Sequence, residues 1–171
     1  SGTKQWTNQL GSSSRDSADD VATDSSGNIY VTGTTYSELD GNTSAGKADL
    51  FVVKYNSSGT HQWTKQLGTD RYDEARGVAT DSSGNVYVTG YTEGGLDGNT
   101  SLGKADLFVV KYNSSGTKQW ANQLGTWDTD FANGVATDSS GNVYVTGSTY
   151  RNLDGNTSAG NADLFVVKYN A

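Results

Sequence analysis

An internal repeat of 57 residues constrains this chain more than any other feature of its sequence. Trp6, Trp63 and Trp120 are separated by this interval, and no insertion or deletion interrupts the register. Three periods account for all 171 residues. Repeats of this size are typical of proteins in which one supersecondary unit recurs and packs against its own neighbours. We therefore expect three copies of one unit, residues 1–57, 58–114 and 115–171.

Each unit contains four segments with the pattern of β-strands. Gly77–Gly90 (GVATDSSGNVYVTG) has two short apolar runs around a Gly- and Asn-containing turn, which is a strong sign of a β-hairpin. Ala105–Asn113 is apolar on both faces, as in a strand that is covered on both sides. The more polar Thr117–Leu124 follows a second short turn. Helical periodicity is absent, so the predicted fold class is all-β.

The four segments predict a meander whose connections alternate between two ends. Short turns fall at one end, and the longer loops around Thr69–Arg76 and Tyr91–Lys104 fall at the other. Gly77–Asp81 has the smallest side chains, which favours the crowded centre of an assembly. Thr117–Leu124 is the most polar segment, which favours the solvated rim.

The motif GVATDSSGNVYVTG, followed by ADLFVVKYNSSGTKQW, resembles the SBBP-type β-propeller repeat of bacterial proteins and, more distantly, the NHL-type repeat. The resemblance covers all three units. It implies that each unit is a four-stranded propeller blade and that the parent protein is secreted or located at the bacterial cell surface. It implies no catalytic residues.

Three blades are too few for a propeller, which usually has about four to eight. The chain starts with Thr3–Leu10, which matches the outer strand of a blade, and ends with Asp163–Asn170, which matches a third strand. We expect Thr3–Leu10 to complete the blade of residues 135–170 in a neighbouring chain. A homodimer would then close a ring of six blades and a homotrimer a ring of nine. A monomeric β-trefoil, which also has three four-stranded units, is the alternative fold.

The composition narrows the range of partners. The formal net charge of −7 and the pI of about 4.5 argue against nucleic acid or an anionic membrane as a partner. Cysteine is absent, and no apolar run has the length of a membrane span. The chain starts within a recurring motif, so we expect it to be trimmed from a larger protein.

No catalytic or cofactor-binding set is predicted. The single histidine, His61, lies on the polar outer segment, so neither a Ser-His-Asp set nor a histidine metal site can be assembled. The Asp-Gly-Asn sequences at Asp40, Asp97 and Asp154 resemble the start of calcium loops. They lack the spacing and the distal Glu of such loops, and a tight turn is the simpler interpretation. The Asp of each Asp-Ser-Ser-Gly-Asn turn is expected to stabilise that turn.

The three copies differ mainly in two windows, both expected in the longer loops. Variable loops on a rigid scaffold are common binding surfaces, although drift at exposed positions is the alternative explanation. The candidate binding face consists of large aromatic and arginine side chains from these windows: Arg15, Tyr36, Arg71, Tyr72, Arg76, Trp127, Phe131, Tyr150 and Arg151.

Together, these patterns predict a non-enzymatic scaffold or interaction module that assembles with itself. An engineered or excised fragment is one interpretation of its near-identical, whole repeats. A lectin-like propeller with sugar sites between its blades is the alternative. A fragment of a secreted hydrolase is a third and less favoured hypothesis.

Overall fold

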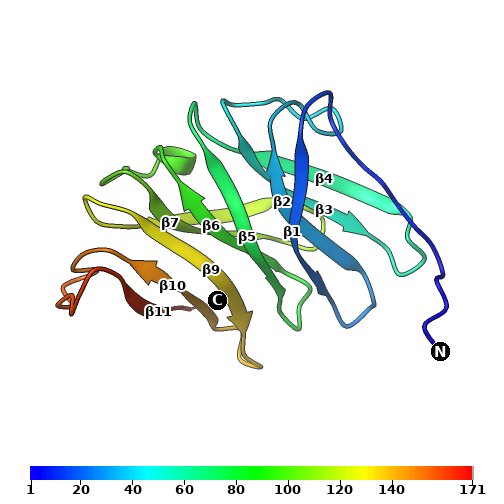
Figure 1. Cartoon of the computed structure of the whole chain (residues 1–171). Coiled ribbons are helices and arrows are strands. Elements are labelled where there is room, and N and C mark those ends of the chain that lie inside the picture. The colour runs from blue at the N-terminus through cyan, green and yellow to red at the C-terminus, as the bar shows by residue number, and fades with distance from the viewer. Residues whose placement is uncertain (171) are drawn as a thin grey trace.

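The computed structural model describes residues 1–170, which form three antiparallel sheets side by side in an arc (Figure 1). Each sheet pairs its strands in chain order, as a meander does. Blade 1 consists of β1 (Asp16–Thr23), β2 (Ile29–Thr35), β3 (Asp49–Tyr55) and β4 (His61–Leu67). Blade 2 consists of β5 (Asp73–Thr80), β6 (Val86–Thr92), β7 (Asp106–Tyr112) and β8 (Lys118–Leu124), with a helical turn, η1 (Leu96–Gly98), between β6 and β7. Blade 3 has three strands, β9 (Asp130–Thr137), β10 (Val143–Thr149) and β11 (Asp163–Tyr169).

This topology confirms the predicted all-β class and the meander. The β-trefoil alternative is wrong, because consecutive strands form separate sheets, four strands each in blades 1 and 2 and three in blade 3. The strand β5 contacts both β1 and β9 across the blades, so these are the innermost strands, as their small side chains predicted. The only helical element in residues 1–170 is three residues long, so none of these residues forms a helix that could cross a membrane.

The inner strand is longer than the sequence pattern predicted. In blade 2 it starts at Asp73 rather than at Gly77, so the expectation that Asp73–Arg76 belongs to a loop was wrong. A β-bulge between Ala75 and Gly77 absorbs one residue and lets the pairing continue to Asp73, which lies opposite Thr92. The same bulge occurs in blades 1 and 3.

The predicted role of the turn aspartates is confirmed in all three blades. Asp81 Oδ1 accepts hydrogen bonds from the backbone N–H groups of Ser83 and Asn85, both at 2.9 Å. Its Oδ2 accepts from Asn85 Nδ2 at 2.7 Å and from the Tyr87 hydroxyl at 2.9 Å. Burial raises the pKa of Asp81, but these hydrogen bonds outweigh burial and the net shift is downward. In the more open blade 3, the hydrogen bond from the Asn142 side chain is the main cause that lowers the pKa of Asp138 to about 2.

The core lies between blades rather than within one sheet. We call the side of a blade that turns toward the preceding blade its leading face, and the opposite side its trailing face. The trailing face of blade 1 (Tyr30, Leu50 and Val52) packs on the leading face of blade 2, which includes Val86, Val88, Phe108, Val110 and Tyr112. The trailing face of blade 2 (Tyr87, Leu107 and Val109) packs in the same way on Val143, Val145 and Phe165 of blade 3. Each junction therefore repeats the same contact.

Candidate functional site

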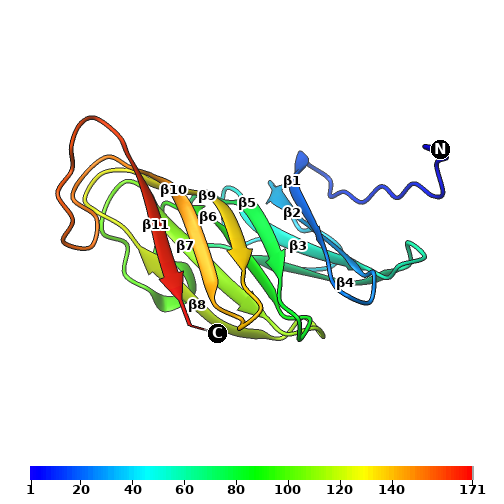
Figure 2. The same ribbon diagram turned by 90° about the horizontal axis from the view of Figure 1, so that it is seen from below.

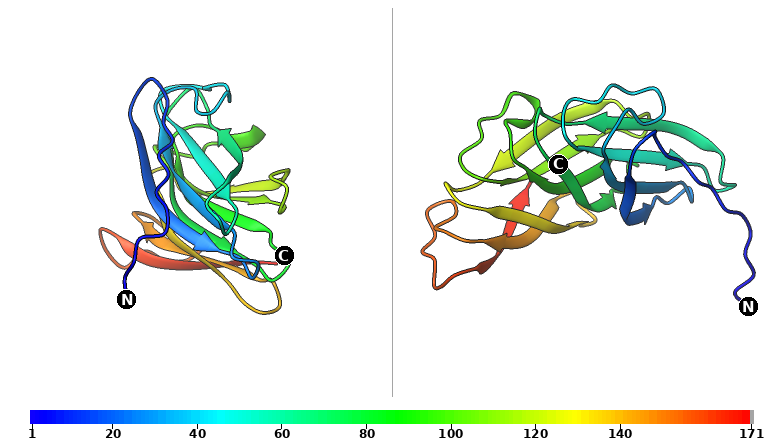
Figure 3. Two further views of the ribbon diagram at one scale, coloured as in Figure 1. Left: turned by 90° about the vertical axis from the view of Figure 1, so that its right-hand side faces the viewer. Right: turned by 45° about the horizontal axis from the view of Figure 1, so that its top comes forward.

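Blade 3 ends the arc with an open edge. Its third strand, β11, pairs with β10 on one side only. The segment that would supply a fourth strand, residues 3–10, is extended, exposed and outside every sheet. This N-terminal segment and β11 lie on opposite sides of the arc (Figure 2 and the right-hand view of Figure 3), so within one chain they do not meet.

The outer faces of the arc are apolar. On the trailing face of blade 3, Leu164 is 83% exposed and Val166 is 66% exposed. Their counterparts in blades 1 and 2 are fully buried at the internal junctions. At the other end, the leading face of blade 1 carries Leu39, Phe51 and Val53 with Val31 and Tyr55 beside them. A groove of about 300 Å³ lies between this face and residues of the N-terminal segment, including Trp6 and Leu10.

The N-terminal segment already lies where the outer strand of a preceding blade would be. Trp63, on the outer strand of blade 1, packs against Gly116 in the last turn of blade 2. Trp6 packs in the same way against Gly59 of blade 1, and Asn8 Nδ2 donates a hydrogen bond of 2.6 Å to the Gly59 carbonyl oxygen. The segment therefore keeps its place beside blade 1 although no strand pairs with it.

A glutamine connects the outer strand to the rest of each complete blade. In blade 1, Gln66 Nε2 donates to Asp49 Oδ2 at 2.7 Å and to the Ser37 carbonyl oxygen at 3.1 Å. Its Oε1 accepts from the backbone N–H of Leu39 at 2.9 Å. In blade 2, Gln123 makes the same three bonds, to Asp106 Oδ2 (2.7 Å), the Gly94 carbonyl oxygen (3.0 Å) and the Leu96 N–H (2.9 Å).

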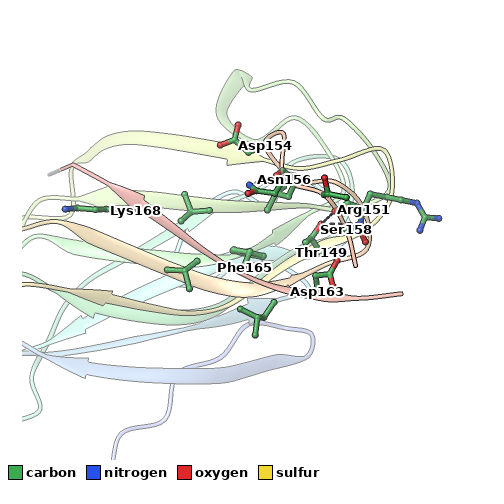
Figure 4. A pocket seen from close by; sticks show the side chains of 13 residues that line it. Thr149, Arg151, Asp154, Asn156, Ser158, Asp163, Phe165 and Lys168 are labelled. Carbon is green, nitrogen blue, oxygen red and sulfur yellow. Dashed lines mark hydrogen bonds between the residues drawn. The ribbon is translucent and has the colours of Figure 1, made fainter. Parts of the chain in front are cut away.

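Blade 3 has the aspartate and the loop backbone groups that bind this glutamine in the other blades, but in the described part of the chain it has no glutamine beside them. A cavity of about 430 Å³ lies beside β11 and is lined by Asp163, Leu153, Arg151 and Asn156 among others (Figure 4). Asp163 Oδ2 accepts a hydrogen bond of 2.9 Å from the Ala159 N–H, and among residues 1–170 no glutamine reaches it. Hydrogen bonds from the Ser158 side chain and the backbone hold the pKa of Asp163 below its ordinary value, so the carboxylate is ready to accept a further donor.

The predicted binding face is divided into two clusters and several separate residues. Arg76 and Phe131 lie in the inner strands rather than in loops, and the Arg76 guanidinium is 4.7 Å from the ring centres of both Phe131 and Tyr91. This cluster joins blades 2 and 3, and Tyr91 was absent from the predicted set. Burial raises the pKa of Tyr91.

The second cluster is more open. Trp127 is 64% exposed, and the Arg151 guanidinium lies 4.3 Å from its ring centre. Asp128 holds Arg151 Nη2 and Lys104 Nζ, each at 2.9 Å, and the hydrogen bond from Lys104 is the main cause that lowers the pKa of Asp128. A flat aromatic face beside polar groups suits contact with a sugar or a protein, and the lectin-like alternative stays a prediction.

The remaining predicted residues are spread along the variable loops. Arg15 and Arg71 are exposed, and Tyr36 is half-buried beside the Arg15 backbone, whose carbonyl oxygen accepts its N–H. Tyr72 lies under Lys47, with the ammonium 5.0 Å from the ring centre, and Tyr150 is exposed. These residues and Trp127 do not form one continuous site.

The calcium candidates occupy tight turns. Asp40, Asp97 and Asp154 all have left-handed backbones, with φ between 50° and 54°, and each precedes a glycine of positive φ. Asp40 pairs with His61 Nε2 at 3.2 Å and Asp97 pairs with Lys118 Nζ. Within residues 1–170, no three His, Asp or Glu side chains gather in a way that could hold a metal ion.

Sequence reasoning missed the glutamine and aspartate that connect the outer strand. The available signal was repetition: a glutamine recurs at residues 9, 66 and 123 of the outer strands, and an Asp opens each long apolar segment. A buried carboxylate at that position needs a hydrogen-bond donor, and glutamine supplies one.

Three meander blades packed face to face define a β-propeller protein. The family model described as a β-propeller repeat, SBBP, matches residues 5–40, 62–97 and 119–154, well over half of the chain. The chain therefore belongs to the SBBP β-propeller repeat family, which confirms the resemblance.

Two curated relatives are similar to this chain. The regulatory protein FlaEY of Caulobacter vibrioides is 28% identical over 147 residues, which cover 78% of this chain and 15% of that protein. An uncharacterized WD repeat-containing protein, L264, of Acanthamoeba polyphaga mimivirus is 37% identical over 86 residues, or 44% of this chain and 6% of that protein. The chain thus spans only a small part of the length of each relative.

Proposed function

We propose that this chain is a non-enzymatic interaction module that assembles with itself into a closed propeller ring. Residues 3–10 of one copy supply the fourth strand to blade 3 of the next copy. The trailing face of blade 3 then packs on the leading face of blade 1 of that next copy. The names of the two relatives, a regulatory protein and a WD repeat-containing protein, support an interaction role rather than an enzymatic one.

The observation that carries this proposal is the repetition of one junction within the chain. Blades 1 and 2 pack as blades 2 and 3 do, and the trailing face of blade 3 and the leading face of blade 1 carry the two halves of the same contact. Because the contact is head-to-tail, copies that use it form either a ring or an open filament. A chain whose three blades already follow an arc favours the ring (Figure 1).

Burial of apolar surface supplies the driving force. Leu164 and Val166 are exposed in the single chain, whereas Leu107 and Val109 at the equivalent internal positions are fully buried. Complete burial of a leucine or valine side chain contributes roughly 1.5–3 kcal/mol. The open β11 edge would also gain backbone hydrogen bonds from the incoming strand and would lose its tendency to pair with unrelated chains.

We expect the native chain to have a mass of about 36 kDa or about 54 kDa in solution, two or three times the chain mass of 18.0 kDa. Light scattering coupled to size-exclusion chromatography over a hundredfold range of concentration measures it. A ring keeps one mass over this range, because every interface is satisfied. A mass of 18 kDa throughout, or a mass that grows with concentration, would contradict the proposal.

A further inference from the structure

We propose that the cavity beside β11 is a recognition site for specific polar groups of the incoming strand, and that Gln9, Thr7 and Lys4 of a second copy fill it. This inference rests on the proposed self-association and names the residues that make it selective. The apolar faces contribute affinity even when the incoming strand is shifted along β11. The polar groups are satisfied in only one register of that strand.

Gln9 is the first of these groups. It stands at the repeat position of Gln66 and Gln123, whose amides each bridge a buried aspartate, a backbone carbonyl and a backbone N–H. The equivalent partners in blade 3 are Asp163, the Arg151 carbonyl oxygen and the Leu153 N–H. Figure 4 shows Asp163 and Arg151 beside the loop end of this cavity.

The Thr7 backbone is the second group. Asn42 Nδ2 donates to the Leu39 carbonyl oxygen at 2.8 Å and to the Thr64 carbonyl oxygen of the outer strand at 3.3 Å. Asn99 does the same with Leu96 and Ala121. Asn156 donates to the Leu153 carbonyl oxygen at 3.0 Å, and among residues 1–170 it has no partner on an outer strand. Thr7 is the repeat equivalent of Thr64, so its carbonyl oxygen would accept the second bond.

Lys4 is the third group. At its repeat position, His61 pairs with Asp40 and Lys118 pairs with Asp97, each across from the outer strand to a tight turn. The equivalent carboxylate in blade 3 is Asp154, which lines the same cavity. An exposed ion pair contributes little free energy, so Lys4 serves mainly to orient the strand.

These three contacts select a register. A strand shifted by one residue turns its side chains to the opposite face, which removes Gln9 from Asp163 and leaves that carboxylate buried without its donor. The cavity therefore distinguishes the N-terminal segment from other extended chains that present only apolar side chains.

The test compares Gln9→Ala with Gln5→Ala by sedimentation equilibrium. Gln5 is a matched control on the same segment, because its counterparts Gln62 and Gln119 donate only to carbonyl oxygens one or two residues earlier in the chain. Loss of hydrogen bonds to a charged group should weaken association by roughly 10- to 100-fold for Gln9→Ala. Gln5→Ala should change it by less than about twofold. Equal effects of the two substitutions would overturn the proposal.

A pair of substitutions at residues 9 and 163 gives a second test. Recovery of association by the second substitution cannot result from general destabilisation of the chain. Gln9→Glu places a carboxylate against Asp163 and should weaken association more than Gln9→Ala does. Adding Asp163→Asn to the same chain restores a donor and an acceptor at this contact, so association should recover by at least about tenfold. Absence of any recovery would contradict a direct contact between residues 9 and 163.

The recognition site remains testable if the ring proposal fails. Should the native chain have a mass of 18.0 kDa, its β11 edge is unoccupied, and a synthetic peptide of residues 1–11 can be titrated into it. At least a tenfold preference for this peptide over its Gln9→Ala form would support the site. No binding, or equal binding of both peptides, would overturn it.

Discussion

Replacing Val166 with aspartate should convert the proposed assembly into single chains of 18.0 kDa without unfolding them. In the single chain, Val166 is 66% exposed, so a carboxylate there remains hydrated and the stability of the blades changes little. In the proposed ring the same position corresponds to Val52 and Val109 of the internal junctions, which are both fully buried. An unpaired carboxylate buried at each interface costs several kcal/mol, so association should weaken by about a thousandfold or more.

The control for this substitution is Leu102→Asp. Leu102 is also largely exposed, at 57%, but it lies in the loop between β6 and β7 and outside the blade faces. Light scattering should give the native mass for Leu102→Asp and the single-chain mass for Val166→Asp, with the same circular dichroism spectrum for both. A native mass for Val166→Asp would show that the trailing face of blade 3 is not an interface.

Replacing Gly90 with alanine should destabilise the chain by about 3 kcal/mol or more and lower the Tm by about 10 °C. Gly90 lies opposite the bulge of β5, and a Cβ there would overlap the Glu74 carbonyl oxygen and lie 2.9 Å from the Ala75 Cα. Neither strand can move away, because β5 and β6 are paired along their whole length and packed between two other blades. Gly33 and Gly147 meet the same obstacle in the other blades.

The matched control for Gly90→Ala is Gly160→Ala. In the single chain no heavy atom lies within 4 Å of the position that a Cβ of residue 160 would take, so in a Val166→Asp background this change should stay within about 0.5 kcal/mol. Both variants should be compared by thermal denaturation in that background, because in the proposed ring residue 160 corresponds to Gly46 and Gly103, whose Cβ would meet the backbone of the next blade. Equal Tm values would show that the bulge tolerates a side chain and that our account of its geometry is wrong.

Much of the fold could be predicted because local patterns and the repeat agree. Three patterns each indicate one place in a blade: the Asp81 turn, the apolar segment before Tyr112 and the polar outer strand. Each pattern recurs at intervals of 57 residues, so the same assignment is supported in all three copies. The small side chains of Gly77–Asp81 correctly indicated the inner position, because β5 packs between β1 and β9 and a Cβ on Gly77 would lie only 3.3 Å from the Gly134 Cα.

The bulge and the polar contacts could not be predicted in the same way. The bulge at Ala75–Gly77 adds a residue that breaks the alternating pattern, so the strand residues Asp73–Arg76 had the appearance of a loop. Gln66 has the appearance of an ordinary surface residue, and its role depends on Asp49, which lies 17 positions away in the chain. Contacts of this kind follow from the pairing of β3 with β4, which the sequence indicates only at the level of whole strands.

A disulfide between copies tests the exchange of the N-terminal strand most directly. Val52 pairs with Lys65 in blade 1 and Val109 pairs with Asn122 in blade 2, so the exchanged strand should place Asn8 opposite Val166. Opposite residues of antiparallel strands have Cα atoms about 4.5–5.5 Å apart, which suits a disulfide, and the chain has no cysteine of its own. After oxidation of the Asn8→Cys/Val166→Cys variant, we predict one covalent species of two or three chains on a non-reducing denaturing gel, with no free thiol. A single-chain band, with free thiols or with an internal disulfide, would contradict the exchanged strand.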